Sequence, residues 1–226
     1  MIDGQGVFFK MSHIHDIRME RFQKAGVYLV TSANMSRGRS TLEVIKSALS
    51  GGIRLIQLRE KNLEREDFMS LAVNARRMTA DFGSLLIIND RIDVAQEIGA
   101  DGVHLGQNDF PIDDARKLAP DLIIGASTHS IDEALKAQSD GASYINIGPL
   151  FPTQTKEWND EFLGIEGLKR ISSIATIPFT VMGGIKKCHI PELKAAGARI
   201  VAVVTEITGA DDPENAARTL LSMMIP

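Results

Sequence analysis

The stretch Ile53-Arg54-Leu55-Ile56-Gln57-Leu58-Arg59-Glu60-Lys61 combines an apolar run, typical of a buried strand, with a polar segment that leaves it. In an extended chain, the alternation sends Gln57, Arg59 and Lys61 to one side and Glu60 to the other. Two cations and an amide on one side suit an anionic ligand such as a diphosphate. A solvated strand end with ordinary surface ions explains this stretch alone equally well.

The same unit, a short apolar run followed by a longer helical pattern, recurs eight times along the chain. We predict strands at Val27–Thr31, Arg54–Leu58, Leu85–Ile88, Gly102–Leu105, Leu122–Gly125, Tyr144–Gly148, Phe179–Met182 and Ile200–Val204. We predict helices at Thr41–Ser50, Arg65–Phe82, Asp93–Ile98, Ile112–Leu118, Ile131–Ser139, Ile165–Ile174, Ile190–Ala196 and Pro213–Met223. Nearly continuous apolar strands are typical of parallel strands buried on both faces. Eight evenly spaced units predict an α/β fold, a single (β/α)8 TIM barrel, and disfavour an open doubly wound sheet.

A short segment precedes the barrel. Residues 1–26 are predicted to form a leader and an N-terminal helix near Ser12–Lys24, and residues 27–226 the catalytic barrel domain. The apolar positions on one face of this helix are Ile14, Ile17 and Phe22, with Met19 towards the edge of that face. His13 and His15 in the same segment are expected to be surface or cap residues.

Composition limits the classes of partner. The chain has 226 residues, 44% of them hydrophobic, which allows a substantial core. A net charge of −4 gives no general attraction to nucleic acid or to acidic membranes. Cys188 is the single cysteine and cannot form an internal disulfide. Because no apolar run reaches the roughly 18 residues of a membrane span, we expect a soluble cytoplasmic protein. The oligomeric state stays open.

The active site of a (β/α)8 barrel lies at the carboxyl ends of its strands. Polar or flexible residues follow the second to eighth predicted strands in turn: Gln57, Arg59 and Lys61; Asn89 and Asp90; Asp109; Ser127; Thr153, Thr155 and Lys156; Gly183 and Gly184; Thr205 and Glu206. These side chains and glycines are therefore expected around one pocket.

Two carboxylates, Asp90 and Asp109, follow neighbouring strands. Like charges brought together repel each other unless a cation lies between them. Oxygen ligands without a nearby histidine or cysteine set favour Mg²⁺ over zinc. The alternative is that both acids cap helices, but Asp93, Asp113 and Asp114 are better placed for that role. We therefore predict a Mg²⁺ site.

A second anion site is predicted after the seventh strand. Gly183 and Gly184 expose backbone N–H groups, and Thr205 follows the next strand, where phosphate commonly binds in such barrels. A glycine pair also serves many ordinary turns. Ser127 offers a hydroxyl, but no Ser–His–Asp spacing favours a hydrolase. His104 lies within a predicted strand and is expected to pack against a neighbouring element.

Six short motifs occur in a fixed order between Val27 and Arg218: Tyr28-Leu29-Val30-Thr31, Gln57-Leu58-Arg59-Glu60-Lys61, Ile88-Asn89-Asp90-Arg91, Gly102-Val103-His104-Leu105-Gly106-Gln107, Gly148-Pro149-Leu150-Phe151-Pro152-Thr153-Gln154-Thr155-Lys156 and Gly183-Gly184-Ile185. Their joint order resembles the thiamine-phosphate synthase family, also named thiamine-phosphate pyrophosphorylases. The resemblance implies a transferase that condenses 4-amino-2-methyl-5-hydroxymethylpyrimidine pyrophosphate with 4-methyl-5-hydroxyethylthiazole phosphate. Thiamine phosphate and pyrophosphate are the implied products, formed by a Mg²⁺-assisted dissociative alkyl transfer.

The resemblance also implies roles for individual residues. Asp90 and Asp109 match the Mg²⁺ ligands. The implied pyrophosphate and pyrimidine contacts are Gln57, Arg59, Lys61, Asn89, Ser127 and Lys156, with Arg59, Ser127 and Lys156 as the implied catalytic residues. The implied contacts to the thiazole phosphate are Thr153, Thr155, Gly183, Gly184 and Thr205.

Two features depart from the family pattern. Thr205-Glu206 replaces a small Ser-Ala-like pair, and a carboxylate beside a phosphate is unfavourable unless it points away. The loop at residues 157–161 is more acidic than expected. Three other functions stay open: a thiazole tautomerase-like isomerase, a non-catalytic phosphate-sensing barrel and a phosphosugar isomerase. None of them explains the paired aspartates together with the cations opposite.

Overall fold

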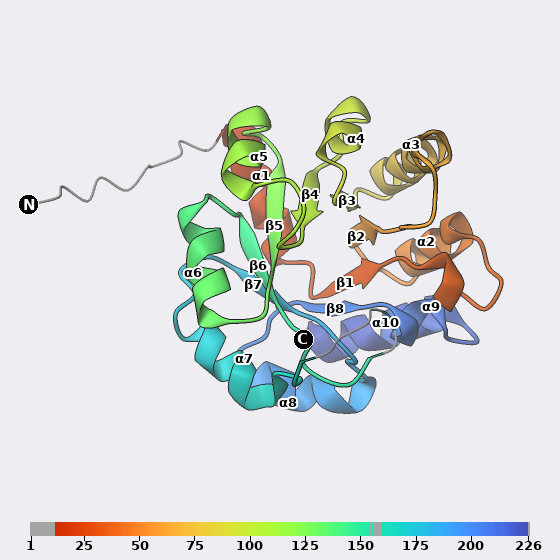
Figure 1. The fold of residues 1–226 in the computed structure, drawn as a ribbon. Coiled ribbons are helices and arrows are strands. Elements are labelled where there is room, and N and C mark those ends of the chain that lie inside the picture. The colour runs from red at the N-terminus through yellow and green to blue at the C-terminus, as the bar shows by residue number, and fades with distance from the viewer. Residues whose placement is uncertain (1–11, 154, 156–159, 226) are drawn as a thin grey trace, which may run out of the picture.

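Eight parallel strands close into a barrel in the computed structural model, which describes residues 12–153, 155 and 160–225. The strands are β1 (Val27–Val30), β2 (Leu55–Leu58), β3 (Leu85–Asn89), β4 (Gly102–Leu105), β5 (Ile123–Thr128), β6 (Tyr144–Ile147), β7 (Phe179–Val181) and β8 (Val201–Val203). They pair in sequence order, and β8 pairs with β1 to close the ring (Figure 1). The predicted (β/α)8 barrel is confirmed.

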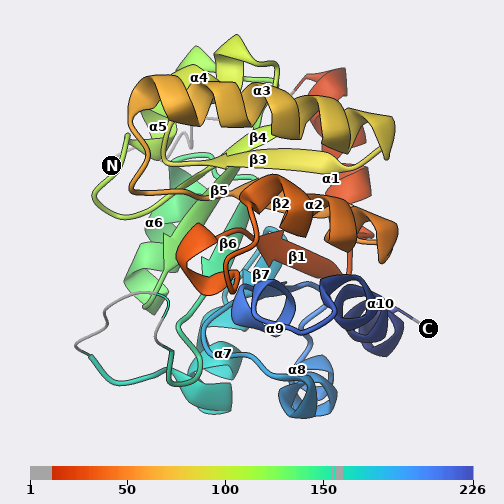
Figure 2. The ribbon, with the colours of Figure 1, turned by 90° about the vertical axis from the view of Figure 1, so that its right-hand side faces the viewer.

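Helices surround the strands on the outside (Figure 2). They are α1 (His13–Gln23), α2 (Thr41–Ser50), α3 (Arg65–Asp81), α4 (Ile92–Glu97), α5 (Ile112–Leu118), α6 (Ile131–Ser139), α7 (Gly164–Ser172), α8 (Ile190–Ala195), α9 (Thr205–Thr208) and α10 (Pro213–Met224), with 3-10 turns η1 (Ala33–Met35) and η2 (Lys187–His189). In the described part of the chain, none of these helices is both long and apolar enough to cross a membrane.

Apolar side chains form two layers on either side of the strands. The outer layer, between strands and helices, includes Leu29, Ile56 and Ile88. The inner layer fills the barrel and includes Tyr28, Leu55 and Tyr144. Alternation along each strand produces both layers, because successive side chains point to opposite faces. The strands are thus rigid supports for whatever follows their carboxyl ends.

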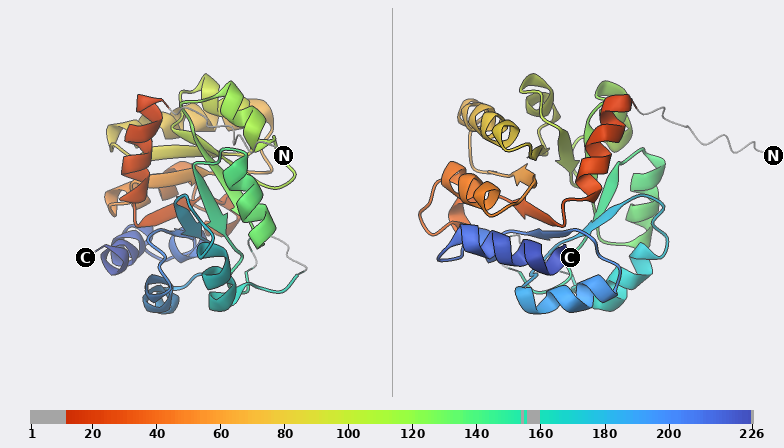
Figure 3. Two further views of the ribbon diagram at one scale, coloured as in Figure 1. Left: turned by 90° about the vertical axis from the view of Figure 1, so that its left-hand side faces the viewer. Right: turned by 180° about the vertical axis from the view of Figure 1, so that it is seen from behind.

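Helix α1 packs on the barrel at the end opposite the pocket described below. It contacts β3 and β5 and lies toward the viewer when the molecule is seen from behind (Figure 3). Phe22 is fully buried, and its ring centroid lies 4.4 Å from that of Tyr144. The predicted position of the helix is confirmed, while the division into a leader and a barrel domain stays a prediction, since residues 1–11 lie outside the described part.

The predicted buried face of α1 was wrong in part. Ile14 and Ile17 are about half exposed, whereas His15 and Met19 are buried with Phe22. Residues 15, 19 and 22 form a stripe at helical spacing, and the imidazole of His15 can be buried because its Nε2 atom bonds the hydroxyl of Ser143 at 2.8 Å. The surface position expected for His15 is therefore wrong.

Some local predictions near the pocket also change. Strand β5 extends to Thr128, so Ser127 lies within the strand and not after it. Asp93 does not cap α4 but lies in its first turn and pairs with Arg65. The acids at 113 and 114 likewise lie inside α5, where both pair with Lys117. These carboxylates pair with neighbouring cations and do not cap the helices. Neither α4 nor α5 has a side-chain cap at its N-terminus.

Candidate active site

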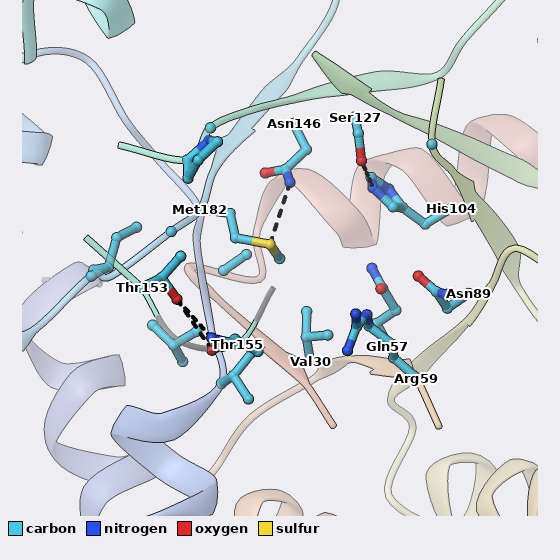
Figure 4. Close-up of a pocket in the computed structure, with 18 of the residues that line it drawn as sticks. Val30, Gln57, Arg59, Asn89, His104, Ser127, Asn146, Thr153, Thr155 and Met182 are labelled. Carbon is cyan, nitrogen blue, oxygen red and sulfur yellow. Dashed lines mark hydrogen bonds between the residues drawn. The ribbon is translucent and has the colours of Figure 1, made fainter. Parts of the chain in front are cut away.

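One pocket opens at the carboxyl ends of the strands, with about 1110 Å³ of space when its solvent-filled mouth is counted. Every predicted site residue in the described part of the chain lines it: Gln57, Arg59, Lys61, Asn89, Asp90, Asp109, Ser127, Thr153, Thr155, Gly183, Gly184 and Thr205. Lys156 lies outside the described residues. Figure 4 shows Arg59, Gln57 and Asn89 on one side of the pocket, with Thr153 and Thr155 on another. The roles of these residues stay predictions.

The side chains after β2 point to two opposite sides, as the alternation of an extended chain predicts. Glu60 is buried away from the pocket, where it accepts hydrogen bonds from the Ala33 N–H at 2.9 Å and the Thr41 hydroxyl at 2.7 Å. Arg59 and Lys61 face the pocket. Partial burial lowers the pKa of Arg59 from its ordinary value, although the neighbouring acids oppose this shift. The guanidinium stays charged and is partly stripped of water, which strengthens its attraction for an anion.

The two predicted metal ligands lie together. The Asp90 N–H donates to the carbonyl of His104 at 2.9 Å, which ties the end of β3 to β4. The carboxylate of Asp109 accepts from the Gly106 N–H at 2.7 Å. Burial, followed by hydrogen bonding to and repulsion from Asp109, raises the pKa of Asp90 to about 6, and Lys61 opposes this shift with its ammonium 3.5 Å from the carboxylate. These two acids therefore repel each other in the ligand-free pocket.

The donor set fits Mg²⁺ better than a transition metal. Among the described residues, no group of three or more His, Cys, Asp and Glu side chains surrounds a common point. Mg²⁺ is commonly held by one or two carboxylates, with water and substrate phosphate completing its shell. Asp90 and Asp109 would supply that share, and a cation between them would relieve their repulsion. The two carboxylates therefore suit a metal ion that binds together with a phosphorylated substrate.

The glycine pair after β7 is required by close packing. Gly183 and Gly184 have positive φ angles of 100° and 62°. A Cβ atom on Gly183 would lie 2.5 Å from the Cα of Pro149, and one on Gly184 would lie 2.3 Å from the carbonyl oxygen of Pro152. The N–H of Phe151 donates to Gly183 at 3.0 Å, so the loops after β6 and β7 are joined. Neither glycine N–H donates a hydrogen bond within the described residues, which leaves both for an anion.

Two threonines line this part of the pocket, and an ion pair lies beside it. The hydroxyl of Thr153 accepts from the Thr155 N–H at 3.2 Å, which brings both hydroxyls to the same turn. The carboxylate of Glu206 accepts from the Lys187 N–H at 3.2 Å and lies 3.3 Å from the Lys186 ammonium. Glu206 does not line the pocket. The carboxylate that departs from the family pattern is therefore neutralised by Lys186.

Sequence reasoning missed three side chains of the pocket. His104, Asn146 and Met182 line it, and Figure 4 shows their side chains around its inner part. His104 is buried as predicted, but its Nε2 atom also lies 3.0 Å from the hydroxyl of Ser127. His104 lies two residues after Gly102 in β4, so the alternation of the strand directs its side chain inward. A polar residue at an inward position was the signal that could have placed it in the pocket.

Comparisons with known proteins agree on one family. The family model described as thiamine monophosphate synthase matches residues 27–207. A thiamine-phosphate synthase of Caldicellulosiruptor bescii is 41% identical over 208 residues, covering 92% of this chain and 95% of the relative. One of Methanoculleus marisnigri is 41% identical over 195 residues, covering 86% and 92%.

Solved structures extend the comparison. A thiamine phosphate pyrophosphorylase from Pyrococcus furiosus has a TM-score of 0.82 at 33% identity, covering 93% of this chain and all of that one. A 3-hexulose-6-phosphate synthase has a TM-score of 0.66 at 21% identity, covering 87% of this chain and 99% of that one. The second likeness shows the shared barrel fold alone.

Proposed function

This chain belongs to the thiamine monophosphate synthase family and is a transferase, and we propose that it makes thiamine phosphate from the two substrates that the sequence motifs imply. The substrates are 4-amino-2-methyl-5-hydroxymethylpyrimidine pyrophosphate and 4-methyl-5-hydroxyethylthiazole phosphate. One observation carries the proposal: an acid pair with adjacent cations lines the same pocket as a glycine pair whose N–H groups donate to no described residue. A diphosphate and a monophosphate can then bind at separate places around it.

The charged side of the pocket suits the leaving group. In the proposed reaction, the bond between the pyrimidine methylene carbon and the diphosphate oxygen breaks, and its electron pair leaves with pyrophosphate. Negative charge grows on that oxygen, where Arg59 and Lys61 would stabilise it. Asn89 and Lys156, whose contacts to pyrophosphate are predicted from the sequence, would donate further hydrogen bonds to the leaving group. Such groups accelerate the reaction because their interactions strengthen as charge develops.

The ring-binding part of the pocket would handle the cation left behind. Gln57 and Ser127 would hold the pyrimidine through its ring nitrogen and amino group. The thiazole nitrogen then donates its lone pair to the methylene carbon, forming the new carbon–nitrogen bond. Thr153, Thr155 and Thr205, with the N–H groups of Gly183 and Gly184, would fix the thiazole through its phosphate. Both rings are thereby held in position for attack.

Asp90 and Asp109 would hold Mg²⁺, which when bound neutralises charge on the pyrophosphate leaving group. Without the ion, burial and then the neighbouring Asp109 carboxyl group raise the pKa of Asp90. Substrate and metal would therefore bind together more tightly than either alone, since each relieves a charge imbalance left by the other.

A pyrophosphate-release assay with both purified substrates tests the proposal. We expect release that requires both substrates and Mg²⁺, and thiamine phosphate in equal amount. Calorimetry with the pyrimidine pyrophosphate should show binding that strengthens with Mg²⁺. A tautomerase would isomerise a thiazole phosphate without releasing pyrophosphate, and a phosphate sensor would bind without turnover. Either of these results would contradict the proposed function.

A further inference from the structure

Five side chains form a hydrogen-bonded chain through the barrel interior, and both of its ends lie in the pocket. The Gln57 amide nitrogen donates to the Tyr28 hydroxyl at 2.8 Å, and the hydroxyls of Tyr28 and Tyr144 lie 3.0 Å apart. The Tyr144 hydroxyl lies 2.8 Å from His104 Nδ1, and His104 Nε2 lies 3.0 Å from the Ser127 hydroxyl. Gln57 and Ser127 line the pocket on β2 and β5.

The protons available on Gln57 and the two tyrosines determine which group donates at the Gln57 end of this hydrogen-bonded chain. Burial raises the pKa of Tyr28 and of Tyr144 well above the ordinary value, so each phenol keeps one proton. The Tyr28 oxygen accepts from Gln57, so its own proton points to Tyr144, the other partner of that hydroxyl within the described residues. With the Gln57 amide nitrogen facing Tyr28, the reverse arrangement would leave a buried hydroxyl proton without an acceptor, which is costly.

The same proton count then determines which ring nitrogen of His104 carries the proton. Tyr144 receives a proton from Tyr28, so it donates its own to His104 Nδ1. That nitrogen must hold a lone pair, and the ring proton of a neutral imidazole is then on Nε2. His104 Nε2–H donates to the oxygen of Ser127. The Ser127 hydroxyl proton is then the last donor of the chain, and Ser127 lines the pocket.

We propose that Tyr28, Tyr144 and His104 are positioning residues that make Ser127 a hydrogen-bond donor and the Gln57 carbonyl oxygen an acceptor toward the substrate, and so select an aminopyrimidine over its oxo counterpart. An aminopyrimidine presents a ring nitrogen that accepts and an amino group that donates. In the oxo counterpart, the ring N–H donates and the carbonyl oxygen accepts. Each pocket group would then meet the wrong partner.

This selection rests on the proposed function, but the direction of the chain does not. Nitrogen-15 NMR of the full-length protein, with His104→Asn used for assignment, reports which ring nitrogen of His104 carries the proton. We expect the Nε2–H form near pH 7.5 in the unmodified protein. A His104 ring protonated on Nδ1, or on both nitrogens, would overturn the proposal whether or not the protein is active.

Two phenylalanine variants separate the steps of the chain. Tyr144→Phe removes the donor to Nδ1, so both ring tautomers should become populated. Tyr28→Phe leaves the Tyr144 proton for Nδ1, so the Nε2–H form should persist while Gln57 loses its acceptor. Thr180→Val is the matched control, since it removes a buried hydroxyl that donates to Asn146 at 2.8 Å in the same barrel but outside the chain. It should leave the tautomer unchanged.

Selectivity is measured by calorimetry with the two pyrimidine monophosphates, which lack the diphosphate leaving group. We expect the unmodified protein to bind the amino form at least ~100-fold more tightly than the oxo form, because a buried site rejects a ligand whose donors and acceptors are reversed. Tyr144→Phe and Tyr28→Phe should each lower that ratio by about tenfold, and Thr180→Val should not. An unchanged ratio in both phenylalanine variants, or no binding of the amino form, would contradict the selection, whereas the pyrophosphate-release assay tests the proposed function separately.

Discussion

The two anion-binding parts of the pocket are preorganised in different ways. Around Asp90 and Asp109 the site consists of charged side chains, which repel or pair with one another while no ligand is bound. Around Gly183 and Gly184 it consists of backbone, held by contacts too close for any Cβ atom. Side chains can readjust when a metal or phosphate binds, whereas packed backbone cannot. The charged part should therefore respond to charge and pH, and the glycine part to volume.

The largest expected effect is on the charged part. Asp109→Ala should reduce Mg²⁺-dependent turnover on the order of 1000-fold, because it removes a metal ligand from the leaving-group site. Pyrophosphate release measured over a range of Mg²⁺ concentrations checks this. The fold should survive, since Asp109 lies in a loop and its main internal contact is to the Gly106 N–H.

Controls for this variant come from the same region. Asp113→Ala removes an exposed acid of the next helix that pairs with Lys117, and it should leave turnover unchanged. Asp109→Asn keeps an acceptor for the Gly106 N–H but loses the charge, and it should be almost as inactive as the alanine variant. Full activity in Asp109→Ala would remove the case for a metal here.

The glycine part should respond to added volume. Gly183→Ala should raise the KM for the thiazole phosphate by about 10- to 100-fold, because the new Cβ would displace the loop that carries the anion-binding N–H groups. Its strained φ should also cost about 1–3 kcal/mol of stability. Steady-state kinetics with each substrate varied in turn, together with thermal unfolding, measures both effects.

Gly197→Ala is the matched control for Gly183→Ala. Gly197 has a similar φ of 92°, but apart from its two chain neighbours no described residue has an atom within 4 Å of a Cβ built there. It should show the backbone strain without the displaced loop, so stability should fall while both KM values stay unchanged. Equal kinetic effects from the two substitutions would refute the volume argument.

The raised pKa of Asp90 predicts that the free energy of unfolding depends on pH. The pKa of Asp90 is raised to about 6, so between about pH 4 and pH 6 the folded protein binds more protons than the unfolded chain. Stability from this group therefore falls as pH rises through that window. Asp90→Asn abolishes the charge, and asparagine tolerates the φ of 61° found here.

Without metal, Asp90→Asn should be more stable than the unmodified protein by about 1–2 kcal/mol above pH 6.5, after allowance for solvent screening, and the difference should shrink toward pH 4. Urea unfolding in EDTA at pH 4.5 and 7.5 measures it. Mg²⁺ with inorganic pyrophosphate should stabilise the unmodified protein more than the variant. A pH-independent difference would mean that the acid pair is not strained.

The smallest effect is expected at the ion pair beside the glycine part, between Glu206 and Lys186. Glu206→Gln keeps an acceptor for the Lys187 N–H but frees Lys186 from its partner. Half-exposed pairs of this kind contribute less than about 1 kcal/mol, so the KM for the thiazole phosphate should change by less than about threefold. A tenfold decrease in that KM would show that the carboxylate opposes phosphate binding even when paired.

Much of the site could be predicted because a closed parallel barrel gathers all its strand ends at one rim. Once Gln57, Asp90 and Gly183 were assigned to strand ends, their common pocket followed without further information. The inward and outward directions of Arg59 and Glu60 followed from the two-residue period of a strand. Thr153 and Thr155 reached the pocket by the same reasoning, since the loop after β6 must cross that rim.

The sequence by itself determined the order of strands and helices, the rim where polar groups gather, and the sides to which alternating residues point. Only the tertiary structure decided which distant side chains meet. The Tyr28–Tyr144 contact joins residues 116 positions apart, and His15 is buried by Ser143, 128 positions away. Periodicity is a property of neighbouring residues, whereas such contacts depend on barrel closure and strand register, which no local pattern encodes.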